Sequence, residues 1–157
     1  MKSVVFDLDG TLADTSADLI AAANACFEGM GAAVRLEPAA DAGIAFRGGR
    51  AMLRAGLSRM GREDEAEVDR WYPRLLDAYE ARIDAETVLY PGAMEAVAAL
   101  REAGFAVGIC TNKPERLARL LLDRLDIEHT FPALVGADTL PVRKPDPAPF
   151  HAAVERA

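Results

Sequence analysis

The chain has 157 residues and a formal net charge of -7, and 51% of its residues are hydrophobic. This composition supplies enough apolar side chains for a packed core, and the acidic balance argues against nucleic acid and membranes as partners. No apolar run approaches the roughly 20 residues that span a bilayer, and Lys2 leads into the first predicted strand without a signal peptide. We therefore expect a cytoplasmic protein whose two cysteines, Cys26 and Cys110, are buried reduced thiols.

The first predicted element is an apolar strand at residues 4–6, which is typical of a strand buried on both faces of a parallel sheet. Asp7 and Asp9 follow this strand, and Gly10 permits a turn that approaches a ligand closely. Carboxylates in this place lie where open α/β sheets bind ligands. Taken alone, the same residues also fit an acidic turn in which Asp9 caps a helix.

Between residues 15 and 85 the spacing of apolar side chains predicts helices only. The first helix begins at Thr15 or Ser16, a short one covers residues 36–45, and a third ends near Gly61. A fourth apolar stripe runs over residues 68–83, where Pro73 is expected to kink or split the helix. Together these helices predict a small bundle.

From residue 90 onward helices and strands alternate, which is typical of a parallel sheet. The pattern predicts a helix at 93–103, a strand at 105–110, a helix at 114–125, a short strand at 133–135 and a last helix that opens at Asp146-Pro147. The chain is thus predicted to be a doubly wound α/β core, residues 1–14 and 86–157, with an all-helical insertion at 15–85. Because the insertion begins just after the two aspartates, it occupies the place of a lid.

Polar side chains follow each predicted strand of the core. Asp7 and Asp9 follow the first, Thr111 and Asn112 the second, and Lys144 the third. A carboxylate pair can supply a nucleophile and an acid/base and can hold Mg²⁺, while a hydroxyl, helix-start amides and a lysine can balance phosphoryl charge. Singly, the last three residues also fit a strand-end hydroxyl, a helix initiator and a solvated charge. Together they predict a phosphate site.

These segments resemble the first three motifs of the haloacid dehalogenase superfamily of phosphohydrolases, and phosphoglycolate phosphatases most closely. The motifs are Asp7-Leu8-Asp9-Gly10-Thr11-Leu12, Thr111-Asn112-Lys113-Pro114 and Lys144-Pro145-Asp146-Pro147. The resemblance extends over nearly the whole chain. It implies a Rossmann-like core with an inserted helical cap.

The resemblance also implies residue roles. Asp7 would be the nucleophile that forms an aspartyl-phosphate, and Asp9 would protonate the leaving alcohol and then activate water. The Asp7 carboxylate and the Asp9 backbone carbonyl would bind Mg²⁺. Thr111 and Lys144 would bind phosphate, and Lys144 would also restrain Asp7. The substrate-binding segments implied by the motifs include Gly10, Thr11 and Asn112.

The loop Arg47-Gly48-Gly49-Arg50 is our candidate for recognising the far end of the substrate. A small anionic substrate needs a cationic partner, and glycines let backbone amides approach it. In related caps a glycine-containing loop at this place faces the active site. Arg47 is the first candidate and Arg50 the second, and a solvated turn with surface arginines is the alternative.

The family's fourth motif, an acidic cluster after a fourth strand, has no counterpart before Ala157. The sequence therefore resembles a phosphatase without its C-terminal strands. We expect weaker metal binding, and we expect an exposed edge at residues 4–6 that favours instability, aggregation, a homo-oligomer or a strand-swapped dimer.

Three functions follow from the sequence. The first is a Mg²⁺-dependent phosphomonoester hydrolase of a small phosphorylated metabolite, with 2-phosphoglycolate as the expected substrate. The second is a sugar-phosphate mutase, which has a similar core but returns the phosphoryl group to its substrate. The third is an incomplete domain that binds phosphate or a partner without turnover.

Overall fold

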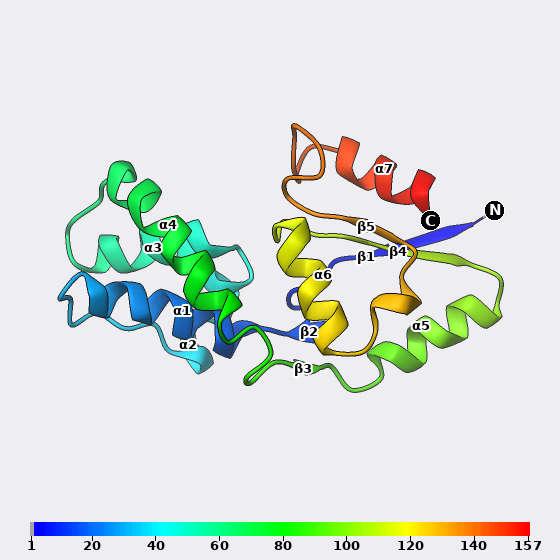
Figure 1. Cartoon of the computed structure of the whole chain (residues 1–157), viewed down its shortest axis with the longest axis horizontal. Coiled ribbons are helices and arrows are strands. Elements are labelled where there is room, and N and C mark those ends of the chain that lie inside the picture. The colour runs from blue at the N-terminus through cyan, green and yellow to red at the C-terminus, as the bar shows by residue number, and fades with distance from the viewer. Residues whose placement is uncertain (1) are drawn as a thin grey trace. The chain divides into compact units, whose positions relative to one another are not determined.

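The computed structural model describes residues 2–157, which form two compact units. One unit is an α/β core, made of the chain up to Asp14 and of Val88–Ala157, and the other is an all-helical cap, Thr15–Thr87 (Figure 1). The predicted boundaries lay after residues 14 and 85. The helical content predicted for the cap and the alternating pattern predicted for the core are both confirmed.

The core contains a three-stranded parallel sheet in the order β1-β4-β5, formed by Ser3–Phe6, Ala106–Cys110 and Ala133–Val135. In its register Val5 faces Gly108, and Gly108 faces Ala133. A side chain at Gly108 would come within 3.1 Å of the Ala133 Cβ, so glycine allows the central strand to pack closely. The parallel sheet predicted from the alternating pattern is therefore confirmed.

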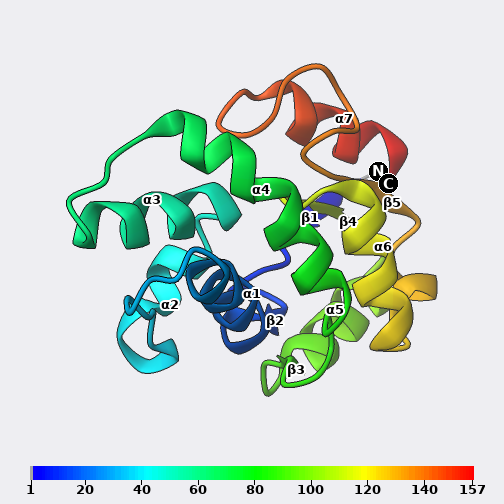
Figure 2. The ribbon, with the colours of Figure 1, turned by 60° about the vertical axis from the view of Figure 1, so that its left-hand side comes forward.

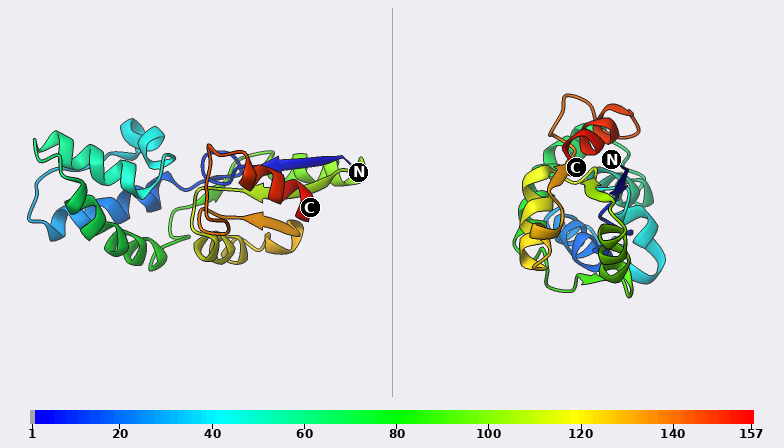
Figure 3. Two further views of the ribbon diagram at one scale, coloured as in Figure 1. Left: turned by 90° about the horizontal axis from the view of Figure 1, so that it is seen from above. Right: turned by 90° about the vertical axis from the view of Figure 1, so that its right-hand side faces the viewer.

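Helices cover both faces of this sheet. Helix α7, Ala148–Arg156, lies on one face, whereas α5, Ala93–Glu102, and α6, Glu115–Arg124, lie on the other (Figure 3). The buried side chains of Cys110, Val135 and Ala153 form a small apolar core beneath α7. Because β1, β4 and β5 are parallel, their C-terminal ends lie at the same edge of the sheet, where the polar segments begin.

Strand β1 differs from its predicted burial. Each of its residues is only half-buried, although the apolar run suggested burial on both faces. The reason is that β1 lies at the edge of the sheet and, within residues 2–157, pairs with β4 alone. Its Phe6 ring still packs edge-on against Phe131, with ring centroids 6.3 Å apart.

A second, antiparallel sheet was not predicted. It joins β2, Ala13–Asp14, to β3, Val88–Leu89, and Asp14 faces Val88 in the register. Two-residue strands are too short to show an alternating pattern in the sequence. The ribbon holds together the two chain segments that lead from the core into the cap.

The cap consists of four helices in which α1 contacts each of the others (Figure 2). These helices are α1, Ser16–Gly29; α2, Pro38–Ala45; α3, Gly49–Arg59; and α4, Glu65–Glu80. The fully buried Phe27 of α1 lies against Gly56 of α3, where a Cβ would come within 2.1 Å of the ring. Glycine therefore sets how closely α1 and α3 can pack.

Pro73 does not split the fourth helix, which runs as one α-helix over Glu65–Glu80. Proline costs this helix one hydrogen bond, because it has no N–H to donate to the carbonyl of Asp69. The buried side chains of Trp71, Leu75 and Tyr79 lie on both sides of the proline in sequence. Their packing against the rest of the cap offsets the missing bond.

A buried carboxylate ties the two ends of the cap together. Asp18 at the start of α1 is fully buried. It accepts hydrogen bonds from Arg82 Nε at 3.2 Å, from the Glu86 backbone N–H at 2.9 Å and from the Thr87 hydroxyl at 2.8 Å. Since those donors lie just before the chain returns to the core, Asp18 fixes the point at which the cap begins and ends.

Both cysteines are free and buried, as expected. Burial raises the pKa of the Cys26 thiol to about 11, although the charge of Arg74 acts in the opposite direction. Burial also raises the pKa of Cys110. In residues 2–157 the structure contains no helix with the length and hydrophobicity needed to cross a bilayer.

Candidate active site

A tight turn after β1 presents the two aspartates. The backbone amides of Thr11, Leu12 and Ala13 all donate to the Leu8 carbonyl, at 3.2, 3.0 and 3.2 Å. The Gly10 amide donates to the Ala13 carbonyl at 2.9 Å, and its φ of 77° is a conformation that favours glycine. The turn is therefore rigid, and glycine at position 10 is required by its backbone.

Asp7 lies open to solvent beside a lysine. Its side chain is 46% exposed, and its Oδ2 lies 3.2 Å from Lys144 Nζ. Its Oδ1 accepts a hydrogen bond from the Leu8 N–H at 2.8 Å. Lys144 Nζ also donates to the Cys110 carbonyl at 2.7 Å, which ties the third polar segment to the end of β4. The carboxylate is thus held by a cation and an amide yet stays accessible.

Thr111 and Asn112 follow β4 and make different hydrogen bonds. Thr111 is buried, and its hydroxyl accepts a hydrogen bond from the Lys113 N–H at 3.1 Å. Asn112 is exposed, and its side-chain amide donates to the Lys144 carbonyl at 3.0 Å. Asn112 therefore fixes the backbone that carries Lys144, which connects the second and third motifs directly.

The two remaining predicted residues of the first motif, Gly10 and Thr11, are exposed in the turn. Both of their backbone amides are used inside the turn, by the Ala13 and Leu8 carbonyls. In this conformation a ligand would meet the Thr11 hydroxyl rather than these amides.

Lys113 is a site residue that the sequence analysis did not identify. Its Nζ lies 2.8 Å from Asp9 Oδ1, and the two side chains are only 4% and 13% exposed. One signal was present in the sequence, since Lys113-Pro114 repeats the Lys144-Pro145 pattern after the neighbouring strand. Each of the two aspartates therefore has its own lysine.

The two arginines of the predicted cap loop have different surroundings, and Arg50 lies not in a loop but in the first turn of α3. Arg50 is engaged within the cap, because its Nη1 lies 2.5 Å from Asp69 Oδ1 and its guanidinium stacks 4.5 Å from the centre of the Tyr72 ring. Arg47 is exposed, and its side chain has no hydrogen-bond or ion-pair partner within residues 2–157. Of the two, Arg47 is the cation that remains available for a ligand.

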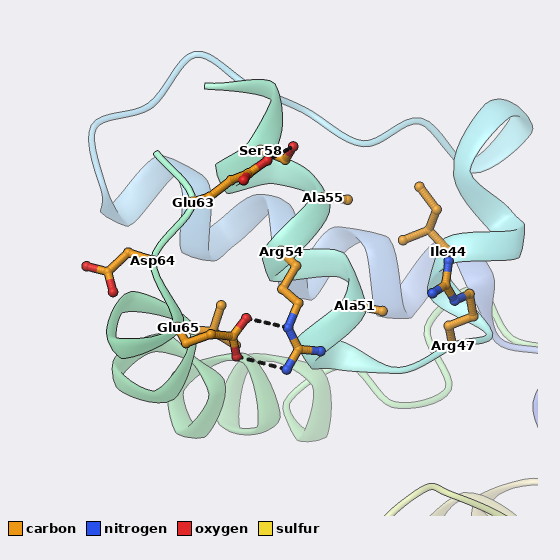
Figure 4. A pocket seen from close by; sticks show the side chains of 10 residues that line it. Ile44, Arg47, Ala51, Arg54, Ala55, Ser58, Glu63, Asp64 and Glu65 are labelled. Atoms are coloured by element: carbon orange, nitrogen blue, oxygen red, sulfur yellow. Dashed lines mark hydrogen bonds and ion pairs between the residues drawn. The ribbon is translucent and has the colours of Figure 1, made fainter. Parts of the chain in front are cut away.

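Arg47 lines a cavity of about 590 Å³ inside the cap. The neighbouring cation, Arg54, is occupied by a two-pronged contact with Glu65, at 2.6 and 2.9 Å (Figure 4). Ser58 donates to Glu63 at 2.7 Å on the same wall. Arg47 points toward Ile44 at the other end of the cavity, away from these acidic side chains (Figure 4).

The oxygen atoms of Asp7 and Asp9 at this edge of the sheet are of the ligand type that Mg²⁺ prefers. Within residues 2–157 no three acidic, histidine or cysteine side chains form a group that could hold a metal. Mg²⁺ needs fewer protein ligands than that, because it commonly binds one or two carboxylates and completes its shell with waters and phosphate oxygens. The exposed Asp7 carboxylate meets this requirement.

Comparison with known proteins shows the family to which this chain belongs. The model of the haloacid dehalogenase-like hydrolase family matches residues 1–157. A phosphoglycolate phosphatase from Agrobacterium fabrum is 36% identical over 98% of this chain and 66% of its own length. The phosphoglycolate phosphatase of Mesorhizobium japonicum is 40% identical over 92% of this chain and 63% of its own. The chain thus spans about two thirds of the length of these curated relatives.

A solved structure from Lactobacillus delbrueckii subsp. bulgaricus superposes with a TM-score of 0.86. The superposition covers 98% of this chain and 72% of that one at 24% identity, a level that establishes the fold alone.

Proposed function

Because the chain belongs to the haloacid dehalogenase-like hydrolases, we propose that it acts in Mg²⁺-dependent hydrolysis of small phosphomonoesters. The substrate proposed is 2-phosphoglycolate, which the names of the two curated relatives support. The proposed reaction passes through an aspartyl-phosphate on Asp7. The proposal concerns the whole protein, and the residues argued below all lie within this chain.

One observation carries the proposal. Asp7 is an exposed carboxylate at the C-terminal end of a parallel strand, with Lys144 Nζ 3.2 Å from its Oδ2. An exposed carboxylate that is purely structural has little need for a lysine fixed by two further contacts, to the Cys110 carbonyl and through Asn112. This arrangement suits a nucleophile that must be oriented beside an anionic phosphoryl group.

In the proposed reaction an Asp7 oxygen attacks phosphorus while the bond from phosphorus to the leaving oxygen breaks. Asp9 supplies the proton that the departing alcohol takes up. Asp9 then accepts a proton from the water that attacks the aspartyl-phosphate, and the products are inorganic phosphate and free Asp7. Lys144 and the Thr111 hydroxyl are proposed to bind the phosphoryl oxygens.

Mg²⁺ would be held by the Asp7 carboxylate and the Asp9 backbone carbonyl, with waters and substrate oxygens as its other ligands. Its chemistry would be to offset negative charge as the phosphoryl group approaches a carboxylate.

For recognition of the substrate's carboxylate we propose Arg47. Arg50 is the poorer candidate, since Asp69 and Tyr72 already hold it. Arg47→Met should raise KM for 2-phosphoglycolate and leave p-nitrophenyl phosphate, which has no carboxylate, nearly unaffected. Arg50→Met serves as the control of matched charge, and an equal effect of both variants would contradict this role.

The function is tested by the release of inorganic phosphate from 2-phosphoglycolate, with Mg²⁺ and after its removal by a chelator. We expect release that requires Mg²⁺ and is lost in Asp7→Asn. Asp123→Asn, which makes the same change at an exposed position of α6, is expected to retain activity. Formation of an isomeric sugar phosphate without net phosphate release would support a mutase instead. Equal activity of the two variants would contradict the proposal.

A further inference from the structure

The first observation is that the Lys113 side chain is buried, although lysine side chains in proteins are rarely buried. Its side chain is 4% exposed, whereas that of Lys144 is 28% exposed. Removing an ammonium from water carries a large desolvation cost, which a paired carboxylate offsets. The carboxylate that does so is Asp9, whose Oδ1 lies 2.8 Å from the Lys113 Nζ.

The second observation is that the backbone of Lys113 is fixed at both ends. Its N–H donates to the Thr111 hydroxyl at 3.1 Å, and its carbonyl accepts from the Ala137 N–H at 2.9 Å. Pro114 follows directly and restricts the conformation of Lys113. A long and otherwise flexible side chain thus starts from a rigid base, and its ammonium contacts the Asp9 carboxylate.

The third observation is the contrast between the two aspartates. Asp7 is 46% exposed and Asp9 only 13%. A nucleophile has to be reached by the substrate, whereas a proton donor has to be oriented toward one atom of it. A displacement of about 1 Å is enough to impair a reaction of this kind.

We propose that Lys113 is a positioning residue that fixes the Asp9 carboxylate for proton transfer to the leaving oxygen. This inference rests on the proposed function, and it assigns to Lys113 a role separate from that of Lys144, which contacts the nucleophile. Lys113 itself transfers no proton and forms no bond to the substrate. It acts through the direction in which Asp9 points.

The test compares two substrates with different leaving groups. Departure of the alkoxide of 2-phosphoglycolate depends strongly on a proton donor, and departure of p-nitrophenolate depends on it little. In Lys113→Met, kcat/KM for 2-phosphoglycolate should fall by about tenfold or more, and kcat/KM for p-nitrophenyl phosphate by no more than about threefold. The KM for 2-phosphoglycolate should change less than kcat. Lys113→Arg, which keeps the charge, should recover part of the loss.

Two reference variants complete the design. Asp9→Asn should show the same selectivity between substrates, and adding Lys113→Met to it should cause no further loss, since Lys113 acts only through Asp9. Lys2→Met, which removes an exposed lysine at the start of the chain, should behave as the unmodified protein. If Lys113→Met does not fold, the comparison of Lys113→Arg with the unmodified protein on the two substrates still provides the test.

Equal losses on the two substrates, or a loss confined to KM, would overturn the inference and point to a structural or phosphate-binding lysine. An additive loss in the double variant would overturn it as well. These outcomes differ from failure of the proposed function itself, which would appear as no phosphate release from either substrate by the unmodified protein.

Discussion

Gly136→Ala tests whether the loop after β5 holds the second motif in place. A Cβ at position 136 would lie 2.5 Å from both Cα and N of Glu115, at the start of α6. The φ of Gly136 lies outside the range that strains other residues, so the only obstacle is space. The neighbouring residues hold the site directly, since the Val135 carbonyl accepts from Thr111 and the Ala137 N–H donates to Lys113.

The size of the destabilisation depends on which atoms the new Cβ would meet. The new Cβ would be about 0.9 Å short of the 3.4 Å at which ordinary contact begins, and the atoms it meets are backbone atoms. Since backbone cannot rotate away, we expect a destabilisation in the upper part of the overpacking range, about 2–3 kcal/mol. For a chain of this size that corresponds to a fall in Tm of about 4–12 °C. Phosphate release should fall further than unfolding explains, because Thr111 and Lys113 are displaced.

Thermal unfolding followed by circular dichroism measures this change, with Gly43→Ala as the matched control. Gly43 lies inside α2, and a Cβ there would meet nothing within 4 Å. The control should therefore be neutral or more stable by about 0.5–1 kcal/mol, because alanine favours a helix. A Gly136→Ala protein as stable and as active as the unmodified one would refute the reasoning about this contact.

Three further predictions concern burial and charge. Asp18→Ala leaves three donors without their acceptor and should destabilise the cap by about 2–4 kcal/mol. Urea unfolding followed by the fluorescence of the single tryptophan measures this change, and Asp18→Asn should be less affected. A hydrogen bond from Arg59 is the main cause that lowers the pKa of Asp41. The contribution of this ion pair to cap stability should therefore be lost as pH falls below about 4, and Asp41→Asn should flatten that loss; an unchanged pH profile would contradict it. Because burial raises the pKa of Cys26 and Cys110, neither should react with iodoacetamide at pH 7.5 in the folded protein, and rapid labelling of either would disprove this.

Much of the fold is encoded in local patterns of the sequence. The strand at Ala133–Val135 and the helix end near Gly61 follow from apolar spacing and from a glycine that allows positive φ. The half-burial of β1 and the unbroken helix through Pro73 did not follow from these patterns. Both depend on what lies beside an element in space, which a single window of sequence does not contain.

The sequence predicted which residues make up the candidate site but not which contacts they make with one another. The residues that follow the three strands could be named because parallel strands end at one edge of the sheet. That Asn112 holds the backbone of Lys144, and that Lys113 rather than solvent partners Asp9, depends on side-chain direction at a strand end. The predicted association into a homo-oligomer or strand-swapped dimer stays a prediction.

The central claim is that Asp7 is the nucleophile, and trapping of the phosphorylated protein tests it most directly. The protein is mixed with Mg²⁺ and excess p-nitrophenyl phosphate, quenched in acid within one turnover, digested with pepsin and analysed by mass spectrometry. We predict one added phosphoryl group on Asp7, a larger amount in Asp9→Asn because the second step then lacks its base, and none in Asp7→Asn. Phosphate release with no phosphoryl group on Asp7, or with the group on another residue, would contradict the account.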